Sequence, residues 1–382
     1  MRILHCITGL SGDGAQRMLL RLTHALRGHE VESAVVNLGQ DDGVARNFED
    51  AGIQVWSLNI SANPVGVIKG ARALGSLIDS FKPEIVQGWM YHANLLVYVA
   101  SSCSRRKFAA LWNIRRGLDD YSERRAKTRC VIRGNAYLSR NAGRIIYCSG
   151  ISREQHERFG FSSKHGVVIE NGFDTDRFQP RRGLRDGIRA RYGIKDSEFL
   201  IGNIGRYDVA KGHRFLIEAF AKLKEPRARL LMIGRGVDSS NPDLTSMLER
   251  LGCRERVILL GEQSAVENIL PGLDLYCSSS IAEGFPNAIS EALTCGVPCV
   301  VTDTGASREI VSNLGWVVAP RDSEALSRGI EEAIAAGDER LRELGQMGRA
   351  RIEERYGMKA IAERYYRVYE GANISGNGWP IN

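Results

Sequence analysis

The chain has 382 residues, of which 43% are hydrophobic and 25% are charged, a composition typical of globular enzymes. It is too long for one ordinary core and suits two domains of roughly 150–200 residues each. No apolar run approaches the roughly 20 residues that a membrane-spanning helix needs, which argues against an integral membrane protein.

The net charge of +7 is distributed unevenly along the chain. Residues 101–160 contain 14 Lys and Arg residues against 5 acidic residues, a local excess of 9 positive charges. Such a stretch favours an anionic partner, for example a lipid headgroup, a lipid diphosphate or nucleic acid. The alternative is a solvated basic face that binds nothing.

Short apolar runs alternate with helical patterns in the first half of the chain. Strands are expected over residues 1–8, 31–39, 53–59, 84–89, 108–115, 144–149 and 167–172. Helices are expected over residues 15–28, 44–52, 66–81, 94–101 and 122–141, after a glycine-containing loop over 9–14. This alternation predicts a parallel sheet with crossover helices.

The segment 171–190 combines Gly, Pro and mixed charge, so it is expected to contain a domain boundary. A second alternating series follows it. Strands are expected over residues 199–206, 228–234, 257–261, 273–279 and 298–303, and helices over 212–224, 246–253, 266–272, 286–295, 323–337 and 339–372. The sequence therefore predicts an α/β protein of two doubly wound Rossmann-like domains that face each other across a cleft.

The eight cysteines do not indicate a disulfide framework. Several lie in strand-like apolar runs, as Cys6 and Cys277 do, where a free thiol behaves as a small hydrophobe. No histidine with metal-ligand spacing lies near Cys295 and Cys299, so neither a metal site nor a cofactor is expected. The first residues have only a short apolar run before a glycine-rich loop, unlike a signal peptide, and a cytoplasmic location is expected.

The stretch 273–296, LDLYCSSSIAEGFPNAISEALTCG, predicts an anion site. Pro286 suits the first position of a helix that Gly296 ends. The unpaired N–H groups of its first turn favour phosphates. Glu291 lies one to two turns inside, where a carboxylate can accept two hydrogen bonds from a vicinal diol such as ribose. The alternative makes Glu283 a first-turn charge partner and Glu291 a solvated helix residue.

A cationic loop, GNIGRYDVAKGH, occupies residues 202–213 after the first strand of the second series. Arg206 and Lys211 project from it and can neutralise a diphosphate leaving group. The loop is not a P-loop, because no Lys-Ser/Thr pair ends it, and the spacing of its glycines does not fit the dinucleotide-binding fingerprint. By itself this loop is only weak support for a diphosphate site.

Together these motifs resemble those of a known family. The segments VIENGFDTDRFQP, GRYDVAKG, LLMIGRG, VILLG and SSSIAEGFPNAISEALTCGVPCVVTDTGASREIV are similar to the retaining glycosyltransferases of group 1, family four, which have the GT-B fold. The resemblance extends over residues 1 to about 370 and is densest over 167–335. Glu283 and Glu291 stand at the two-glutamate motif of that family.

The resemblance implies a role for each residue at a matching position. Arg206 and Lys211 bind the donor diphosphate, Glu283 contacts the donor sugar, and Glu291 contacts the ribose. The implied catalytic residues are His92, Arg206, Lys211 and Glu283. The implied donor-binding residues are Gly205, Arg206, Lys211, Gly234, Gln263, Glu283, Gly284, Phe285, Pro286, Asn287 and Glu291. Neither a metal nor another cofactor is implied, since the cations and the helix dipole balance the leaving charge.

The resemblance also implies an acceptor site in the first domain. Its residues are Gly12, Asp13, Gly14, Tyr91, Asn94, Arg115 and Arg116. Asp13 and Gln16 replace a glycine and a glutamate that the family usually has after the first strand, so this loop is expected to touch the acceptor rather than a phosphate, with a plain strand–helix turn as the alternative. His92 stands near the position of a cleft histidine, with a helix-terminal or core histidine as the alternative.

The implied domains are an acceptor-binding domain over 1–178, a nucleotide-sugar-binding domain over 179–355, and a segment over 356–382 whose helix crosses back to the first domain before a loose tail. The implied activity is retaining, metal-independent hexosyl transfer from a nucleoside-diphosphate sugar, UDP before GDP, to a lipid-linked glycan in cell-surface polysaccharide biosynthesis. The chain is then cytoplasmic or peripheral on the inner face of the plasma membrane, with residues 101–160 against anionic lipid.

Three alternatives stay open within this resemblance: a transferase that acts on a soluble acceptor, a sugar-nucleotide epimerase, and a catalytically silent GT-B nucleotide-binding subunit. A nucleic-acid partner is not expected, because no recognised module or aromatic platform accompanies the basic stretch. The identity of the sugar, the linkage and the oligomeric state do not follow from the sequence.

Overall fold

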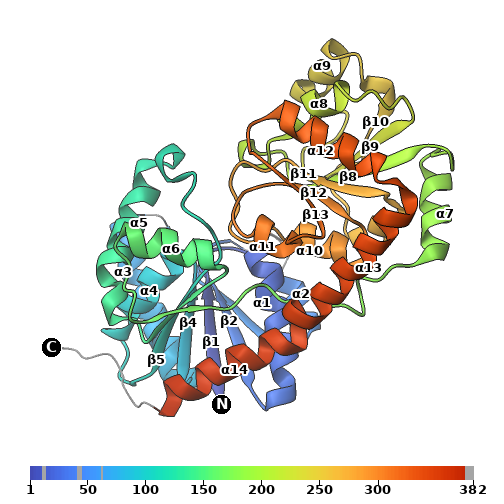
Figure 1. Cartoon of the computed structure of the whole chain (residues 1–382). Coiled ribbons are helices and arrows are strands. Elements are labelled where there is room, and N and C mark those ends of the chain that lie inside the picture. The colour runs from blue at the N-terminus through green and yellow to red at the C-terminus, as the bar shows by residue number, and fades with distance from the viewer. Residues whose placement is uncertain (11–13, 41–44, 62, 375–382) are drawn as a thin grey trace. The chain divides into compact units, whose positions relative to one another are not determined.

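The computed structural model describes residues 1–10, 14–40, 45–61 and 63–374 (Figure 1). The chain forms two compact units. Unit 1 contains Met1–Gly172 and the chain from Met358 onward, and unit 2 is Phe173–Gly357. The divisions between the units thus follow residues 172 and 357, whereas the sequence predicts limits at 178 and 355. The assignment of acceptor binding to the first domain and donor binding to the second stays a prediction.

Unit 1 is built on a seven-stranded parallel sheet with the strand order β3-β2-β1-β4-β5-β6-β7. Its strands are β1 (Arg2–Ile7), β2 (Glu32–Asn37), β3 (Gln54–Ser57), β4 (Ile85–Trp89), β5 (Ala109–Ile114), β6 (Arg144–Tyr147) and β7 (Gly166–Val168). Its helices are α1 (Gly14–Ala25), α2 (Ala45–Asp50), α3 (Pro64–Phe81), α4 (Tyr91–Ser101), α5 (Ala126–Leu138), α6 (Gly150–Phe159) and α14 (Met358–Ile374).

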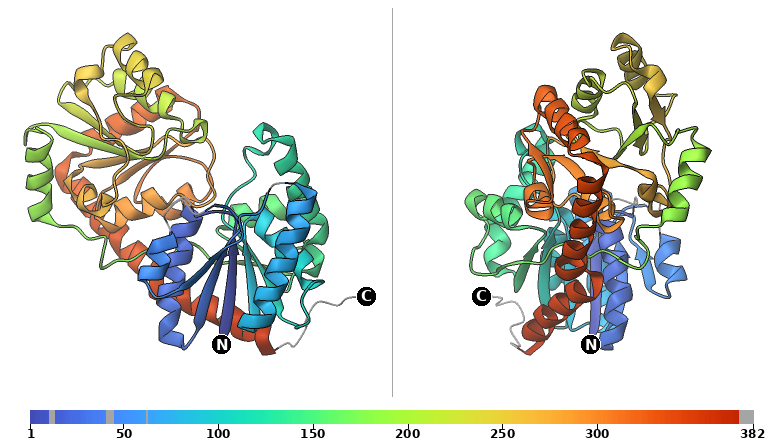
Figure 2. Two further views of the ribbon diagram at one scale, coloured as in Figure 1. Left: turned by 180° about the vertical axis from the view of Figure 1, so that it is seen from behind. Right: turned by 45° about the vertical axis from the view of Figure 1, so that its right-hand side comes forward.

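Helices cover both faces of this sheet (Figures 1 and 2). On one face, α1 and α14 share an apolar cluster with β1 and β4, in which Leu19, Trp89 and Tyr365 are fully buried. On the other face, α3 and α4 contribute Leu74 and Val97 to a second cluster. Strands covered on both faces read as continuous apolar runs, which is why the sequence pattern locates them well.

Unit 2 is built on a six-stranded parallel sheet with the strand order β10-β9-β8-β11-β12-β13. Its strands are β8 (Phe199–Ile204), β9 (Ala228–Ile233), β10 (Val257–Leu259), β11 (Leu275–Ser278), β12 (Cys299–Thr302) and β13 (Gly315–Val318). Its helices are α7 (Arg182–Arg191), α8 (His213–Ala221), α9 (Pro242–Arg250), α10 (Asn287–Thr294), α11 (Ser307–Val311), α12 (Ser323–Ala335) and α13 (Gly337–Tyr356). Two parallel sheets with alternating helices confirm the predicted fold class.

The structure also corrects the sequence prediction in detail. Helices α6, α7 and α11 and strand β13 were not expected. The helix expected over 266–272 is instead two short 3₁₀ turns, the second of which begins at Leu270 before Pro271. The segment 339–372, which was expected to be helical throughout, forms α13 and α14, divided at Gly357.

An ion pair at the base of unit 2 joins α7 to the start of β11. Arg189 is only 2% exposed, and its guanidinium lies 3.1 Å from Asp274 Oδ2. The same guanidinium donates to the carbonyl oxygens of Lys195 and Glu198 at 2.7 and 2.5 Å. Asp274 also accepts the backbone N–H of Leu200 at 2.7 Å. The carboxylate therefore ties α7, β8 and β11 together.

All eight cysteines are free thiols, of which Cys103 and Cys130 are exposed and six are buried. Burial raises the pKa of Cys295 to about 12, so this thiol stays protonated. No helix in the described part of the chain has the length and apolar character to span a membrane. Within the same residues, no group of three or more His, Cys, Asp or Glu side chains is arranged to hold a metal ion.

Candidate functional site

The candidate donor site lies where the strand order of unit 2 reverses. β8 and β11 are neighbours, but the chain leaves β8 towards β9 on one side and β11 towards β12 on the other. Ligands of open α/β sheets bind beyond the carboxyl ends of strands at such a switch point. The loop after β8 carries Lys211, and the loop after β11 carries Glu283. The backbone N–H of Ile281 donates to the carbonyl of Ala210 at 2.8 Å, so the two loops are hydrogen-bonded to each other.

Lys211 and Glu283 form the central contact of this site. Lys211 Nζ lies 2.5 Å from Glu283 Oε1, and the two side chains are 26% and 13% exposed. Ser280 Oγ donates to the same carboxylate oxygen at 2.7 Å. A pocket surrounds the pair and is lined by Asn203, Ile204, Lys211, Tyr276, Ser278, Ser280, Glu283, Pro286, Asn287 and Ala288. Glu283 thus lies in the loop before α10 and pairs with Lys211, so the alternative of a first-turn charge partner does not hold.

The backbone beside Lys211 requires a glycine. Gly212 has φ +62°, and a Cβ atom there would lie 2.1 Å from the carbonyl oxygen of Ser279. Ser279 Oγ donates to the carbonyl of Lys211 at 2.9 Å, which holds the two loops in register. A side chain at position 212 would force these loops apart and displace the ammonium group.

Helix α10 follows this loop. It begins at Asn287, so Pro286 takes the N-cap place, one residue earlier than the expected first helical position. Gly296, with φ +75°, follows the end of the helix as predicted. Glu291 is 2% exposed, so the alternative of a solvated helix residue does not hold. A carboxylate in this position is buried in unit 2, on the helix whose first turn adjoins Lys211 and Glu283.

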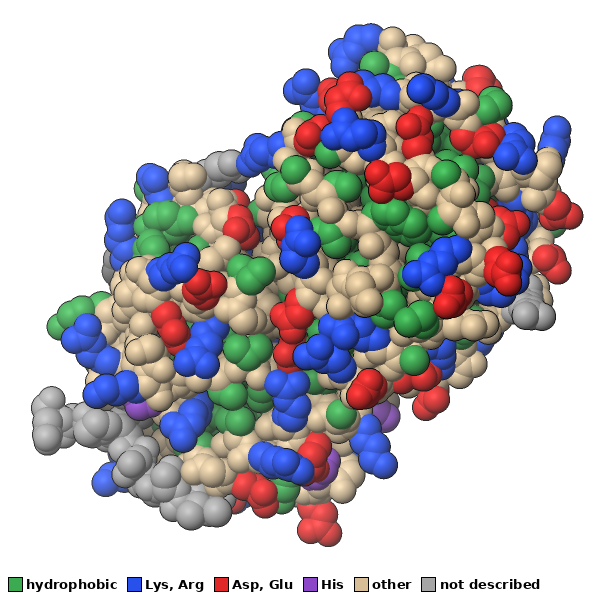
Figure 3. All heavy atoms as spheres, viewed as in Figure 1, with side chains coloured by type: hydrophobic (Ala, Val, Ile, Leu, Met, Phe, Trp, Pro, Cys, Tyr) green, Lys and Arg blue, Asp and Glu red, His purple; other side chains and the backbone are tan. Residues whose placement is uncertain are grey.

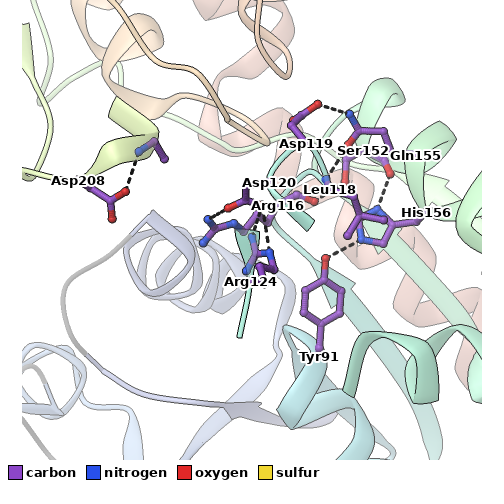
Figure 4. Close-up of polar contacts among 11 residues, drawn as sticks. Tyr91, Arg116, Leu118, Asp119, Asp120, Arg124, Ser152, Gln155, His156 and Asp208 are labelled. Atoms are coloured by element: carbon purple, nitrogen blue, oxygen red, sulfur yellow. Dashed lines mark hydrogen bonds and ion pairs between the residues drawn. The ribbon is translucent and has the colours of Figure 1, made fainter. Parts of the chain in front are cut away.

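Arg206 precedes Lys211 in the same loop. Its side chain is 35% exposed, and its Nε donates to Asp208 Oδ2 at 3.2 Å. The other oxygen of Asp208 accepts the backbone N–H of Ala210 at 2.9 Å and caps the short turn that ends in Lys211 (Figure 4). Asp208 therefore positions both cations of the loop.

The remaining predicted donor residues lie along the same edge of the sheet. The N–H of Gly205 donates to the carbonyl of Ile233 at 2.9 Å, and the N–H of Gly234 donates to the carbonyl of Gly261, also at 2.9 Å. Gln263 donates to the carbonyl of Leu260 at 2.8 Å. The loops after β8, β9 and β10 are thus linked by backbone hydrogen bonds.

Two neighbouring side chains serve packing. Phe285 is 6% exposed and lies between the rings of Phe173 and Tyr356, with centroids 6.1 and 5.5 Å away. Its backbone rather than its ring is therefore available to a ligand. His213 is 3% exposed, and burial lowers its pKa to about 4. It is therefore neutral beside Lys211.

His92 and Gly14, two of the predicted residues of unit 1, lie at the starts of helices beside the switch point between β1 and β4. Gly14 begins α1, whereas Gly12 and Asp13 lie outside the described residues. His92 is exposed in the first turn of α4, and desolvation by the surrounding protein lowers its pKa. Met90, just before this helix, has φ +71° and ψ 168°, a conformation that is essentially restricted to glycine. The start of α4 therefore holds backbone strain beside His92.

Tyr91 turns into the protein and anchors this strained segment (Figure 4). Its hydroxyl lies 2.7 Å from His156 Nε2, and His156 Nδ1 lies 2.6 Å from the carbonyl oxygen of Ser152. A carbonyl can only accept, so Nδ1 carries the proton and Nε2 accepts from Tyr91. Burial lowers the pKa of His156 to about 4 and keeps the ring neutral. The sequence does not reveal this pair, because 65 residues separate its members.

The other predicted acceptor residues divide into buried and surface groups. Asn94 is fully buried. The guanidinium of Arg115 donates to the carbonyl of Ile169 at 2.9 Å, to the hydroxyl of Tyr365 at 3.0 Å, and to Asn171. Tyr91 and Arg115 thus form hydrogen bonds within the protein, and Asn94 is buried. The acceptor role of these three residues stays a prediction.

Arg116 differs from these residues because its side chain is 37% exposed. Arg116 Nη2 lies 2.5 Å from Asp120 Oδ2, and Arg124 Nη2 lies 2.7 Å from the other oxygen of the same carboxylate (Figure 4). Two guanidinium groups share one carboxylate, so this cluster retains a positive charge at the surface of unit 1. Such a cluster favours an anionic ligand.

Two family models match the chain. The glycosyl transferases group 1 model matches residues 185–351, and the glycosyl transferase 4-like domain model matches residues 13–172. Among curated proteins, N-acetyl-alpha-D-glucosaminyl L-malate synthase of Bacillus anthracis is 29% identical over 187 residues, 48% of each chain. N-acetylgalactosamine-N,N'-diacetylbacillosaminyl-diphospho-undecaprenol 4-alpha-N-acetylgalactosaminyltransferase of Campylobacter jejuni is 27% identical over 189 residues, which cover 49% of this chain and 48% of that protein. The chain thus spans about half the length of the curated relatives it matches.

A solved structure extends the likeness over the whole fold. Anabaena Alr3699/HepE, crystallised in complex with UDP and glucose, superimposes with a TM-score of 0.85 over 97% of this chain and 100% of that one, at 21% identity. At this identity the likeness concerns the fold, which is the two-domain GT-B fold. With one family model on each unit, the chain belongs to the group 1 glycosyltransferases of family four and has the GT-B fold that its motifs predict.

Proposed function

We propose that the chain transfers a glycosyl group from a nucleoside-diphosphate sugar, with the donor bound at the carboxyl edge of the unit 2 sheet. The observation that carries this proposal is the contact between Lys211 and Glu283 at the switch point between β8 and β11. A cation suited to a diphosphate and a carboxylate suited to sugar hydroxyls stand side by side at the start of α10. The buried Glu291 supplies the carboxylate for the ribose.

The charges at this site support a metal-independent mechanism. Arg206, Lys211 and the first turn of α10 would stabilise the negative charge that develops on the leaving diphosphate. In a front-face reaction the leaving phosphate oxygen accepts the proton of the acceptor hydroxyl as the glycosidic bond forms, so the anomeric configuration is retained. The anomeric coupling constant of the product, measured by NMR, distinguishes retention from inversion.

UDP-sugars are the favoured donors, and a lipid-linked glycan is the favoured acceptor. The HepE crystals contain UDP and glucose, and the relative from Campylobacter jejuni is named for a sugar carried on diphospho-undecaprenol. The positive cluster of Arg116 and Arg124 around Asp120 suits a phosphate-bearing acceptor. His92 is proposed as the further catalytic residue of unit 1.

Nucleotide binding tests the proposal. A UDP-sugar present without metal at 100 times its Kd is expected to stabilise the native protein by about 2.7 kcal/mol. Glu291→Ala is expected to remove most of this shift, because the two ribose hydroxyls lose the carboxylate that accepts their hydrogen bonds. The measurement is thermal unfolding with nucleoside diphosphates and their sugars.

The matched control is Glu249→Ala, which removes an exposed glutamate from α9. It should leave the shift unchanged. No shift with any nucleotide, in a protein that unfolds cooperatively, would contradict the transferase and favour a silent GT-B subunit. A full shift in the Glu291→Ala variant would place the nucleotide elsewhere.

We further propose that unit 1 meets an anionic membrane surface through α3 and α5. Part of the basic stretch 101–160 is neutralised, since Arg153 pairs with Glu157 and Arg158 with Glu154. Helix α5 contains no acidic residue and exposes Lys127, Arg133 and Tyr137, the last with 70% of its surface accessible. Helix α3 adds Val65 and Ile68, which are 62% and 52% exposed. Figure 3 shows Lys and Arg side chains exposed on unit 1.

Vesicle binding tests this surface. Replacement of both Lys127 and Arg133 by serine is expected to weaken binding to phosphatidylglycerol vesicles, since each cation near an anionic membrane contributes about 1 kcal/mol. Moderate salt should weaken the binding of the unmodified chain as well. The control is Arg158→Ser on α6, whose arginine is already paired. Equal binding to neutral phosphatidylcholine vesicles, or an equal loss in the control, would contradict the proposal.

A further inference from the structure

The ammonium group proposed to hold the donor diphosphate forms an ion pair with a carboxylate of the same site. Lys211 Nζ contacts Glu283 Oε1 at 2.5 Å, and both side chains are largely withdrawn from solvent. The inference below rests on the proposed function, in which these two residues bind different parts of one donor. A diphosphate that takes Lys211 must therefore first compete with the carboxylate.

The cost of this competition depends on what replaces Lys211 at the carboxylate. Without the lysine, Glu283 retains the hydrogen bond from Ser280 Oγ at 2.7 Å but loses its cation. A charge that is mostly buried and loses its partner destabilises the state in which it sits. Hydroxyls of the transferred sugar can donate to the freed oxygens and remove this penalty. A nucleoside diphosphate without that sugar has hydroxyls only on its ribose, which the proposed function places at Glu291.

The surrounding backbone makes this a side-chain exchange rather than a loop movement. The two loops are joined by the bond from Ile281 to Ala210 and by the bond from Ser279 to Lys211. The aliphatic part of Lys211 lies over Gly205, about 3.3 Å from where a Cβ atom would stand. The aliphatic part of the Lys211 side chain is held in place, and only its terminal ammonium group must turn. The ammonium can therefore move from the carboxylate to a phosphate without rearrangement of the fold.

We propose that Glu283 competes with the nucleoside diphosphate for Lys211, so that the site binds the intact sugar nucleotide in preference to the spent diphosphate. Once the sugar has been transferred, Glu283 loses the hydroxyls and regains Lys211. The diphosphate is then held by one cation fewer and dissociates. Glu283 thereby contacts the donor sugar and also makes the site prefer the sugar nucleotide over the nucleoside diphosphate.

The test is the affinity of the Glu283→Gln variant for UDP and for UDP-glucose, measured by titration calorimetry without metal. The neutral amide releases Lys211, so UDP is expected to bind roughly tenfold more tightly than to the unmodified chain. The preference for UDP-glucose over UDP should fall by a similar factor. In the Lys211→Ala background, the same substitution should no longer strengthen UDP binding.

Two further variants separate this effect from others. Asp303→Asn removes one negative charge from the loop after β12, where Asp303 pairs with Arg308, and should leave UDP affinity unchanged. Glu283→Asp keeps the charge on a shorter side chain and should give a smaller gain, which supports the proposal even if the glutamine variant fails to fold. UDP affinity that is unchanged or weaker in both Glu283 variants would overturn the inference while the proposed function stands. Absence of binding by the folded, unmodified chain to UDP, GDP and their sugars would overturn the proposed function and the inference together.

Discussion

Replacement of Lys211 by alanine is expected to lower kcat/KM for glycosyl transfer by roughly 10²–10³, the cost of removing one preorganised group that stabilises transition-state charge. The Lys211 side chain is only 26% exposed and follows the turn that Asp208 caps, and a water molecule in its place would not supply the positive charge. The larger share of the loss should appear in kcat, because the charge on the diphosphate grows as the glycosidic bond breaks. The measurement is steady-state kinetics with a radiolabelled sugar donor.

Lys222→Ala is the matched control for this variant. Lys222 lies just after α8 in the same unit, is 43% exposed, and pairs with the exposed Glu324. Its removal should change kcat/KM less than twofold. A Lys211→Ala variant that folds and retains more than a third of the activity would show that the diphosphate is stabilised by other groups, of which Arg206 is the first to test.

Replacement of Asp274 by alanine is expected to destabilise unit 2 by about 3–5 kcal/mol. The substitution leaves the guanidinium of Arg189, which is 2% exposed, without its counter-charge, and it removes the acceptor of the Leu200 N–H. The two carbonyl oxygens that also bind Arg189 do not neutralise its charge. Urea unfolding followed by circular dichroism measures the loss.

Asp303→Asn again supplies the comparison, this time for stability. Its partner Arg308 is 63% exposed, and exposed ion pairs contribute about 0–1 kcal/mol. If Asp274→Ala costs no more than this control, the contact with Arg189 is not a stabilising one. Simultaneous replacement of Arg189 by methionine should recover part of the loss, because no unpaired charge then remains buried.

The sequence predicts the two sheets well because their strands are buried on both faces and read as apolar runs. It fails at α7, whose sequence RGLRDGIRAR has few apolar residues and lies in a segment rich in Gly and charge. That helix is stabilised by contacts distant in the chain, such as the pair of Arg185 with Asp274 at 2.5 Å. Strand β13 has the four-residue apolar sequence GWVV, is only partly buried, and was not expected.

The positions of the candidate donor residues follow from the sequence more completely than those of the candidate acceptor residues, and the roles of both groups stay predictions. Lys211 and Glu283 each follow a strand that the pattern locates, and parallel strands that are neighbours bring such residues to one edge. Their direct contact does not follow from the pattern, because the sequence does not say that β8 and β11 are neighbours. In unit 1, the inward turn of Tyr91 depends on His156 in a distant helix, and the packing of Arg115 depends on Tyr365 in α14. Side-chain direction at a helix start is decided by such partners and not by local spacing.

The distribution of the thiols gives the unaltered chain a labelling pattern of its own. Cys103 and Cys130 are exposed and belong to unit 1, whereas every cysteine of unit 2 is buried. A maleimide dye would therefore attach to the folded chain at these two positions, and further attachment would report that a core has opened. Because Cys130 lies on α5, its dye would also sense an approaching bilayer through a change in fluorescence. Folding and surface contact thus become observable in one chain without an introduced cysteine.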